Sequence, residues 1–394
     1  MSDWKEVRLG EILQFQRGFD LLAKDRNEGS IPVVSSSGIT GYHNTAKAKS
    51  PGVIIGRKGT LGTVHYIDID YWPHDTTLWV KDFKRNWPRF IYYFLKLMRL
   101  ENYDVGASNP TLNRNHIHKI RLKFPPLPVQ KKIAAILSAY DDLIENNNRR
   151  IVILEKMAEE IYREWFVRLR FPGHKQVKFN KGIPEDWEVK QIQNVCKVAR
   201  GSSPRPINDN KYFLNGNIPW IKIADATASK IFLYETKEYV NDLGASFSRK
   251  LAKGSLIIAT SGTLGFCIFL GVEGCVHDGW MYLAEYKNNV KASFLYYVIN
   301  YYQEHLNNLS YGAAIQNINT EIIRRLPLIL PAGEVLINFY SVIEPIHEKI
   351  DALGKANNII QQTRDRLLTR LISGKLSVED LDIQFPPSMT EELE

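Results

Sequence analysis

The 394-residue sequence contains few cysteines and no cysteine-rich motif. Its three cysteines, Cys196, Cys267 and Cys275, are never spaced as C-x-x-C, and an odd number cannot all pair within one chain. This pattern suits a reducing compartment and offers no zinc framework. We therefore expect a cytoplasmic chain without a metal site.

Long hydrophobic runs are also missing. No apolar stretch approaches the roughly 18 to 20 residues that a membrane-spanning helix needs, and the opening segment MSDWKEVRLG lacks the apolar centre of a signal peptide. We expect no association with a membrane.

Motifs of catalysis and cofactor binding are absent or incomplete. No G-x-x-x-x-G-K-[ST] loop occurs, and no G-x-G-x-x-G follows a predicted strand. The segment Asn109–Leu112 lacks the second proline and the aromatic residue of an amino-methyltransferase loop, and Asp225 with Glu235–Lys237 only resembles the pattern of a metal-dependent nuclease. We expect no catalytic residues and no cofactor bound by this chain.

The composition is that of a folded, moderately basic protein. Hydrophobic residues make up 44% and charged residues 24% of the chain, which excludes global disorder, and the net charge is +8. Residues 1–179 carry 29 basic and 19 acidic side chains, whereas six acidic residues and no basic one lie in 376–394. A basic body of this kind fits a polyanionic partner.

The sequence contains an internal repeat. Trp4–Gly18 aligns without a gap to Trp187–Gly201, with Trp at the start and Arg-Gly at the end of both. Val53–Gly62 recurs as Leu256–Gly265, and both segments end in GTLG. Landmarks in one order at nearly one spacing indicate two copies of one module.

Each copy is predicted to be a mixed α/β domain. Short β-branched runs near glycines predict strands at 53–56, 63–67, 256–260 and 266–270. The segments that begin at Phe90 and Phe294 (Phe-x-Tyr-Tyr) have the pattern of an amphipathic helix.

A long helical pattern follows each copy. Apolar residues alternate in steps of three and four from Ile133 to Trp165 and from Phe339 to Leu371. Such a period over more than four heptads indicates a coiled-coil seam, although two helices packed separately on their own domains would also fit. If the helices pair antiparallel with Ile133 opposite Leu371, Asn147 faces Asn357 and sets the register. Pro345 should make the second helix kink or restart.

Polar clusters occur at equivalent points of the two copies but differ in identity. Ser, Thr, Asn, Gln, Arg and Lys are the side chains that read base edges in the DNA major groove. The candidate DNA-binding residues are Ser35, Ser36, Ser37, Tyr42, His43, Asn44, Arg57, Lys58, Thr60, Thr76, Thr77, Asn109, Asn113, Arg114, Ser202, Ser203, Arg205, Lys222, Asp225, Thr260, Ser261, Thr263, Gln316, Asn317 and Asn319. Ordinary loop polarity is the alternative for any single one of them.

Other repeated residues are interpreted as structural. His74-Asp75 recurs as His277-Asp278, but no nucleophile elbow accompanies either pair. The GTLG segments are interpreted as tight turns between strands, with a backbone clamp for nucleic acid as the alternative. The residues assigned a structural role are Trp4, Trp187, His74, Asp75, His277, Asp278, Asn147 and Asn357.

The ordered set of motifs resembles the specificity subunit of type I restriction–modification systems over essentially the full length. The motifs are W-x-x-V-x-L-x-E-I from Trp4, I-P-V-V-S-S-S-G-I-T-G-Y-H from Ile31, V-I-I-G-R-K-G-T-L-G from Val53, W-P-H-D-T-T from Trp72, L-N-R from Leu112 and P-P-L-P-V-Q-K-K-I-A from Pro125. The second copy departs from them, with Ala-Thr-Ser at 259–261 and Gly-Trp at 279–280.

The resemblance implies an α+β protein with two tandem target-recognition domains, each followed by a long helix, the two helices forming an antiparallel coiled coil. The corresponding divisions are 1–125 (first target-recognition domain), 126–170 (first spacer helix), 171–183 (linker), 184–331 (second target-recognition domain), 332–375 (second spacer helix) and 376–394 (acidic tail).

The resemblance also implies a non-catalytic subunit that reads a bipartite site in double-stranded DNA and directs adenine methylation or restriction. The expected partners are two methyltransferase subunits and one restriction motor subunit, which would bind S-adenosylmethionine, ATP and Mg. A self-contained DNA modification enzyme and a coiled-coil assembly protein without DNA readout are the alternatives.

Overall fold

The computed structural model describes residues 4–103, 110–226, 231–262, 264–312, 318–386 and residue 389. Its chain divides into two compact units. Unit 1 comprises residues 1–145 and 359–394, and unit 2 comprises residues 146–358. No helix in these ranges is long and apolar enough to cross a membrane.

Unit 1 holds the first copy of the repeat. Its strands are β1 (Lys5–Arg8), β2 (Gln14–Arg17), β3 (Ile31–Ser35), β4 (Gly38–His43), β5 (Gly52–Gly56), β6 (Val64–Ile67), β7 (Trp72–Pro73), β8 (Thr77–Asp82) and β9 (Arg121–Phe124). Its helices are α1 (Leu9–Ile12), η1 (Ala23–Asp25), α2 (Pro88–Leu97), η2 (Leu100–Tyr103) and α3 (Arg114–Ile117).

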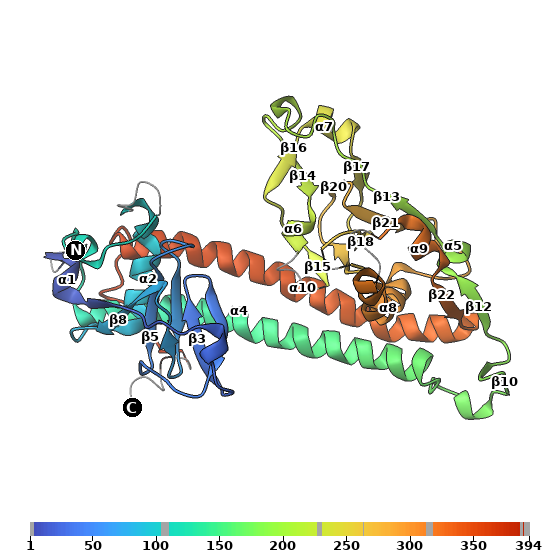
Figure 1. The fold of residues 1–394 in the computed structure, drawn as a ribbon, viewed down its shortest axis with the longest axis horizontal. Helices are drawn as coiled ribbons and strands as arrows, with labels where there is room; N and C mark the ends of the chain where they lie inside the picture. Colours follow the sequence, from blue (N-terminus) through green and yellow to red (C-terminus); the bar gives the residue numbers. More distant parts are fainter. Residues whose placement is uncertain are drawn as a thin grey trace. The chain divides into compact units, whose positions relative to one another are not determined.

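Two sheets and a strand pair form this copy. The larger sheet has the order β2-β8-β5-β6, the smaller one β4-β3-β7, and β1 pairs with β9. Every residue of β5 is buried, as expected for a continuous apolar run at the centre of a sheet. Helix α2 packs against β5 and β6 (Figure 1), and its buried side chains complete the core of unit 1.

Unit 2 holds the second copy. Its strands are β10 (Phe179–Asn180), β11 (Ile183–Pro184), β12 (Glu188–Gln191), β13 (Lys197–Arg200), β14 (Ile218–Ile221), β15 (Phe232–Leu233), β16 (Glu238–Val240), β17 (Arg249–Leu251), β18 (Leu256–Ala259), β19 (Cys267–Leu270), β20 (Gly274–Val276), β21 (Trp280–Ala284) and β22 (Pro327–Leu330). Its helices are η3 (Arg163–Val167), η4 (His174–Gln176), α5 (Ile192–Val195), η5 (Asn210–Tyr212), α6 (Ile223–Ala226), α7 (Asp242–Ser246), α8 (Ala292–Gly312) and α9 (Thr320–Arg325).

The sheets of unit 2 repeat those of unit 1. The order β13-β21-β18-β19 matches β2-β8-β5-β6, with β15 added at its edge. In the smaller sheet β14 pairs antiparallel with β16 and parallel with β20, just as β3 pairs with β4 and β7. The predicted duplication and the predicted mixed α/β class are therefore confirmed.

The individual elements also follow the sequence patterns. The four predicted strands correspond to β5, β6, β18 and β19, each end lying within one residue of the prediction. The two Phe-x-Tyr-Tyr segments lie in α2 and α8.

Two long helices, α4 (Leu127–Tyr162) and α10 (Gly333–Ile372), each contribute to both units. In unit 1, Ile133 and Leu137 of α4 share the hydrophobic core with Leu371 of α10. In unit 2, later residues of α4 share the core with earlier residues of α10. The pattern within each unit is that of an antiparallel pair.

Helix α10 does not restart at Pro345, contrary to one of the two outcomes predicted for this residue. Proline removes a single backbone donor. The buried side chains of Phe339, Ile343 and Ile350 lie on both sides of Pro345 in one hydrophobic core. Their packing keeps the helix continuous.

Part of the segment after α10 is packed onto unit 1. Val378 and Met389 are buried in its core, and Lys132 Nζ donates to the backbone oxygen of Glu379 over 2.6 Å. This segment is acidic in composition, but its apolar side chains Val378 and Met389 attach it to the core of unit 1.

Candidate nucleic-acid interface

The two copies share a backbone framework at the ends of their central strands. In unit 1 the amide of Leu112 donates to the backbone oxygen of Arg57 over 3.0 Å. In unit 2 the amide of Ile318 donates to the oxygen of Thr260 over 2.8 Å. Equivalent backbone positions therefore carry Arg in one copy and Thr in the other.

Three candidate loops of unit 1 meet at Thr76. Its backbone oxygen accepts hydrogen bonds from the amides of Arg57 (2.8 Å) and Lys58 (3.0 Å), and its Oγ1 accepts one from the Ser36 amide (3.3 Å). Thr63 Oγ1 donates to the oxygen of Ser36 over 2.5 Å. The loops after β3 and β5 and before β8 therefore form one connected surface.

A His-Asp pair borders this surface. His74 Nδ1 lies 3.0 Å from Asp75 Oδ1, and Asp75 Oδ2 lies 3.2 Å from Arg17 Nη2. Burial and the neighbouring Arg17 lower the pKa of the Arg57 guanidinium, against the opposite effect of Asp75. Arg17 Nη2 also lies 3.4 Å from Asp20 Oδ1, so this corner holds two arginines and two carboxylates. A guanidinium group in this position suits a phosphate or a guanine.

Arg17 also lies at this surface, although it is not among the candidates from the sequence. It belongs to the Arg-Gly dipeptide that ends the first repeated segment, and its counterpart Arg200 donates from Nε to the backbone oxygen of Asp278 over 2.8 Å. The repetition of Arg next to Gly, together with the repeated His-Asp pair, was the available signal.

Tyr42, His43 and Asn44 lie apart from the Thr76 surface. His43 pairs with Ile31 at the opposite end of β3 from Ser35, and four residues of strand span about 13 Å. The buried His43 ring contacts Trp72, and its Nδ1 accepts a hydrogen bond from the Asn27 amide (3.0 Å). Its contacts are those of a core histidine.

In unit 2 the candidate cations have carboxylate partners. Arg205 forms an ion pair with Asp278, whose amide donates to Ser203 Oγ over 3.2 Å. Asp278 Oδ1 also lies 3.1 Å from His277 Nε2. Burial is the main cause that lowers the pKa of His277.

Asp225 stabilises a turn. Its carboxylate accepts hydrogen bonds from the Lys222 amide (2.9 Å), Thr236 Oγ1 (2.8 Å) and the Lys237 amide (3.3 Å). Lys222 itself is ion-paired with Glu238. Within the described ranges no group of three His, Cys, Asp or Glu side chains is placed to hold a metal ion.

Several other candidates serve the local backbone. Thr77 Oγ1 donates to the oxygen of His74 (2.7 Å), and Thr260 Oγ1 donates to that of Gly279 (2.8 Å). Asn113 and Asn319 cap the N-termini of α3 and α9. The GTLG segments lie between paired strands, and their glycines have φ of +72° to +75°, as the turn interpretation requires.

Accessibility divides the candidates further. The exposed ones are Ser37, Tyr42, Asn44, Thr60, Asn113, Arg114, Arg205 and Asn319. The half-buried ones are Arg57, Lys58, Thr76, Ser202, Ser203, Lys222, Asp225 and Ser261, and the buried ones are Ser35, Ser36, His43, Thr77 and Thr260. Asn109, Thr263, Gln316 and Asn317 lie outside the described residues.

The repeated tryptophans belong to the protein core. Trp187 is buried and contacts Phe166 and Phe171, with ring centroids 5.9 and 4.8 Å apart. Trp4 is half-buried and packs against the core of unit 1.

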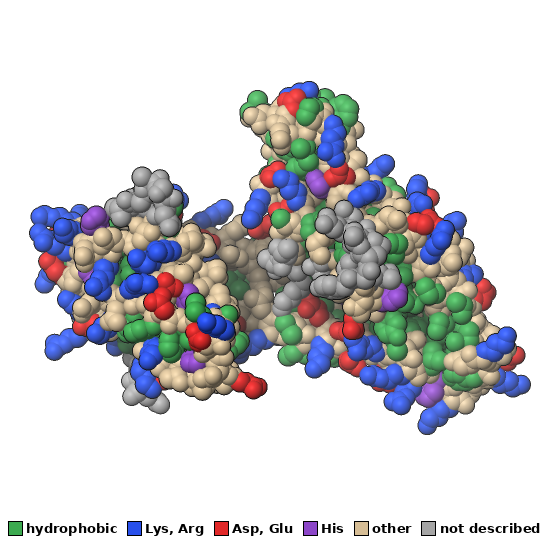
Figure 2. Space-filling model, in the orientation of Figure 1, with side chains coloured by type: hydrophobic (Ala, Val, Ile, Leu, Met, Phe, Trp, Pro, Cys, Tyr) green, Lys and Arg blue, Asp and Glu red, His purple; other side chains and the backbone are tan. Residues whose placement is uncertain are grey.

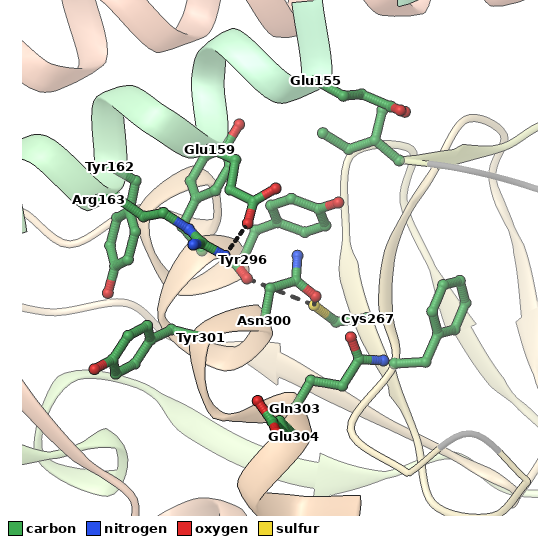
Figure 3. Close-up of a pocket in the computed structure, with 13 residues that line it drawn as sticks. Glu155, Glu159, Tyr162, Arg163, Cys267, Tyr296, Asn300, Tyr301, Gln303 and Glu304 are labelled. Atoms are coloured by element: carbon green, nitrogen blue, oxygen red, sulfur yellow. Dashed lines mark hydrogen bonds and ion pairs between the residues drawn. The ribbon is translucent and has the colours of Figure 1, made fainter. Parts of the chain in front are cut away.

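A cavity of about 700 Å³ lies in unit 2 between α4 and α8 (Figure 3). Glu155, Glu159 and Glu304 contribute carboxylates to its lining, and Arg163 pairs with Glu159 over 2.6 Å. Burial raises the pKa of the Tyr296 phenol in its wall. Its carboxylates disfavour a phosphate backbone, so we do not place DNA there.

On the face shown in Figure 2, Lys and Arg side chains occur on both units and are mixed with Asp and Glu. Positive charge is thus available on both copies, as two separate contacts with a polyanion require.

The family model described as the type I restriction modification DNA specificity domain matches residues 1–156 and 184–368. The chain belongs to this family. Each matched segment contains one copy of the repeat and part of one long helix. The protein is therefore a specificity subunit of a type I restriction–modification system and not the catalytic component of that system.

Curated relatives agree over most of the chain. The MjaIX specificity subunit of Methanocaldococcus jannaschii is 28% identical over 307 residues, which cover 74% of this chain and 70% of the relative. The HindI specificity subunit of Haemophilus influenzae is 21% identical over 465 residues, covering 95% of this chain and all of the relative.

The fold is similar to that of a solved structure. The crystal structure of the type I restriction–modification S subunit from M. genitalium matches with a TM-score of 0.60 and 15% identity, covering 94% of this chain and 96% of that one. At this identity the match supports the fold alone.

Proposed function

We propose that this specificity subunit reads a bipartite site in double-stranded DNA, with one half-site contacted by each copy of the repeat. The observation that carries the proposal is the shared framework with exchanged side chains, in which Arg57 and Thr260 occupy equivalent positions. Arginine pairs bidentately with guanine, whereas Thr260 is buried and its hydroxyl donates to the Gly279 oxygen, so unit 2 offers no equivalent guanine contact at this position. One scaffold with two different sets of side chains fits two different half-sites.

We assign the reading role in unit 1 first to the residues around Thr76. Arg57 and Lys58 provide positive charge there, whereas Arg17 is paired with Asp20 and Asp75. Ser37 and Arg114 are exposed polar residues of the same copy. Phosphate contacts would fix the position of the duplex, and base contacts would select its sequence.

The long helices are proposed to form an antiparallel coiled coil that separates the half-sites. Two contacts support it: Asn147 bonds to Asn357 within unit 2, and Asp141 pairs with Arg364 within unit 1. Both pairs fit one antiparallel register.

The proposed partners are two methyltransferase subunits and a restriction motor subunit acting in the cytoplasm. Two copies of one module present two quasi-equivalent surfaces, which suits two copies of a partner. S-adenosylmethionine, ATP and Mg would be bound by these partners, and the chain would direct adenine methylation or restriction without a reactive centre of its own.

Footprinting of the chain bound to its methyltransferase subunits tests this function. We expect two protected segments with an unprotected stretch between them. Absence of protection would instead favour an assembly protein without DNA readout. Binding of S-adenosylmethionine by the isolated chain would favour a self-contained enzyme.

A further inference from the structure

A second hollow of unit 2 has a volume of about 740 Å³. Residues of β14 and β16, two neighbouring strands of the smaller sheet (Figure 1), contribute to its lining. Three asparagines, Asn208, Asn210 and Asn215, contribute to its lining, and we call it the Asn pocket. Lys237 and Trp220 also line it. None of these five residues is among the candidates from the sequence.

The segment that carries the asparagines differs between the copies. From Gly18 to Ile31 the chain advances 13 residues, whereas from Gly201 to Ile218, the equivalent segment, it advances 17. The Asn pocket is therefore built from a part of the repeat that has diverged, as a determinant of a different half-site would be.

The loop before β14 is held in place by contacts that do not involve the side chains of its three asparagines. Asn241 Nδ2 donates to the backbone oxygens of Lys211 (2.7 Å) and Leu214 (3.1 Å). A Cβ at Gly216 would lie 2.4 Å from the oxygen of Tyr239, so only glycine allows this close approach of the two backbones. A loop fixed in this way presents its side chains in defined positions.

The carboxamides of Asn208, Asn210 and Asn215 are exposed and make no hydrogen bond to the described residues. Trp220 is 1% exposed, and its Nε1 lacks a hydrogen-bond partner in the same part of the chain. The three exposed carboxamides thus present donors and acceptors that the described residues do not use.

The pocket combines charged and neutral groups: the positive charge of Lys237 suits a phosphate, whereas the asparagine carboxamides and Glu238 suit base edges. Lys222 is paired with Glu238, and its ammonium lies 4.8 Å from the centre of the Trp220 ring. The carboxylate of Glu238 repels a phosphate but accepts from an exocyclic amino group, and an asparagine carboxamide pairs bidentately with adenine.

We propose that Asn208, Asn210 and Asn215 read base edges of the half-site contacted by unit 2, including at least one adenine. The proposal rests on the proposed function of the chain. It moves the specificity of the second copy from the Thr260 loop, where side chains serve the backbone, to the loop before β14.

The test uses the full chain bound to its methyltransferase subunits and a duplex library with a randomised segment, with bound duplexes sequenced. The triple variant Asn208→Ala, Asn210→Ala, Asn215→Ala should lose the preference for adenine in one half-site by about 5- to 100-fold while keeping the other half-site. Asn217→Ala is the matched control, because Asn217 is an exposed residue of the same loop outside the pocket.

An unchanged site in the triple variant would overturn the proposal, and so would altered preference in both half-sites. Three single variants keep the amide but displace it: Asn208→Gln, Asn210→Gln and Asn215→Gln. Each is expected to change the base preference in one half-site only, and a change in both half-sites would overturn the proposal. Failure of the proposed function is distinguishable, because the unsubstituted complex would then select no bipartite site.

Discussion

Asn147 Nδ2 donates a hydrogen bond to Asn357 Oδ1 over 2.8 Å, joining two buried carboxamides that lie 210 residues apart in the sequence. Asn357 Nδ2 donates in turn to Asn148 Oδ1 over 3.0 Å. The contact is the one that the antiparallel register predicts. A paired polar group in an apolar seam costs stability but disfavours shifted registers.

Asn147→Ala should destabilise unit 2 by about 1 to 3 kcal/mol, because it leaves the buried Oδ1 of Asn357 without the donor that Asn147 supplies. Urea unfolding measures this loss, and Asn146→Ala, at an exposed neighbouring position, is the control. The double variant Asn147→Leu, Asn357→Leu should recover stability. Equal stability of Asn147→Ala and the unsubstituted chain would show that the contact has no energetic role.

A second polar pair lies in unit 1. Arg364 Nη1 is 2.5 Å from Asp141 Oδ1, and the Tyr93 hydroxyl donates to Asp141 Oδ2 over 2.5 Å. The Arg364 side chain is 13% exposed. Burial acts to lower the pKa of Arg364, but its bonds to Asp141 and Asp365 outweigh this effect and raise it.

Asp141→Ala should destabilise unit 1 by about 3 kcal/mol, because it leaves a nearly buried charge with a single exposed partner. Asp365→Ala is the control, since Asp365 is 53% exposed and should contribute about 0.5 kcal/mol or less. Thermal unfolding in low salt distinguishes the two. Similar losses in both variants would contradict the role assigned to Asp141.

His347 is expected to make the stability of unit 2 depend on pH. Its ring is buried among aromatic side chains and its Nε2 lies 2.7 Å from the Tyr297 hydroxyl. Burial lowers its pKa from 6.5 to about 4. Between these values the unfolded chain binds more protons than the folded one, so stability is complete above pH 6.5 and falls as the pH decreases toward 4.

The expected loss from His347 is about 3 kcal/mol between pH 6.5 and pH 4. Burial lowers the pKa of His118 and His277 as well, which adds in the same direction. Urea unfolding at several pH values gives the free energy of unfolding as a function of pH. This free energy should change less with pH for His347→Gln than for the unsubstituted chain. An identical pH dependence of the free energy of unfolding in both proteins would exclude His347 as its source.

Much of the fold could be predicted from local patterns. The buried strands β5 and β18 are short apolar runs, and α4 and α10 have long apolar periods, so each carries a signal within its own segment. The addition of β15 to one sheet and the burial of Val378 depend on contacts with distant residues. A single sequence shows no local pattern for such contacts.

The candidate site was harder to predict, because residue type does not show which polar groups the backbone uses. Thr77 and Thr260 look like reading residues in sequence but bond to neighbouring carbonyls. Asn208 and Asn215 look like loop polarity, yet they remain exposed around a pocket. Only the contacts separate these two kinds of side chain.

The proposed spacer predicts a measurable change in the DNA site. One heptad inserted at facing positions of α4 and α10 lengthens each helix by about 10 Å, which corresponds to about three base pairs of duplex. Methylome sequencing should show a longer unread gap between unchanged half-sites. Insertion into α4 alone is the control. It should abolish methylation, because the apolar residues of α4 and α10 would no longer face each other along the whole pair of helices. An unaltered gap after the double insertion would contradict the spacer.

The division of labour between the two copies is tested by exchanging residues 1–125 for the equivalent segment of another specificity subunit. The methylated sites are then determined in cells that also contain the methyltransferase. We expect one half-site to be replaced and the other to be retained at the same spacing. Replacement of both half-sites, or of neither, would contradict the claim that each copy of the repeat reads its own half of the DNA site.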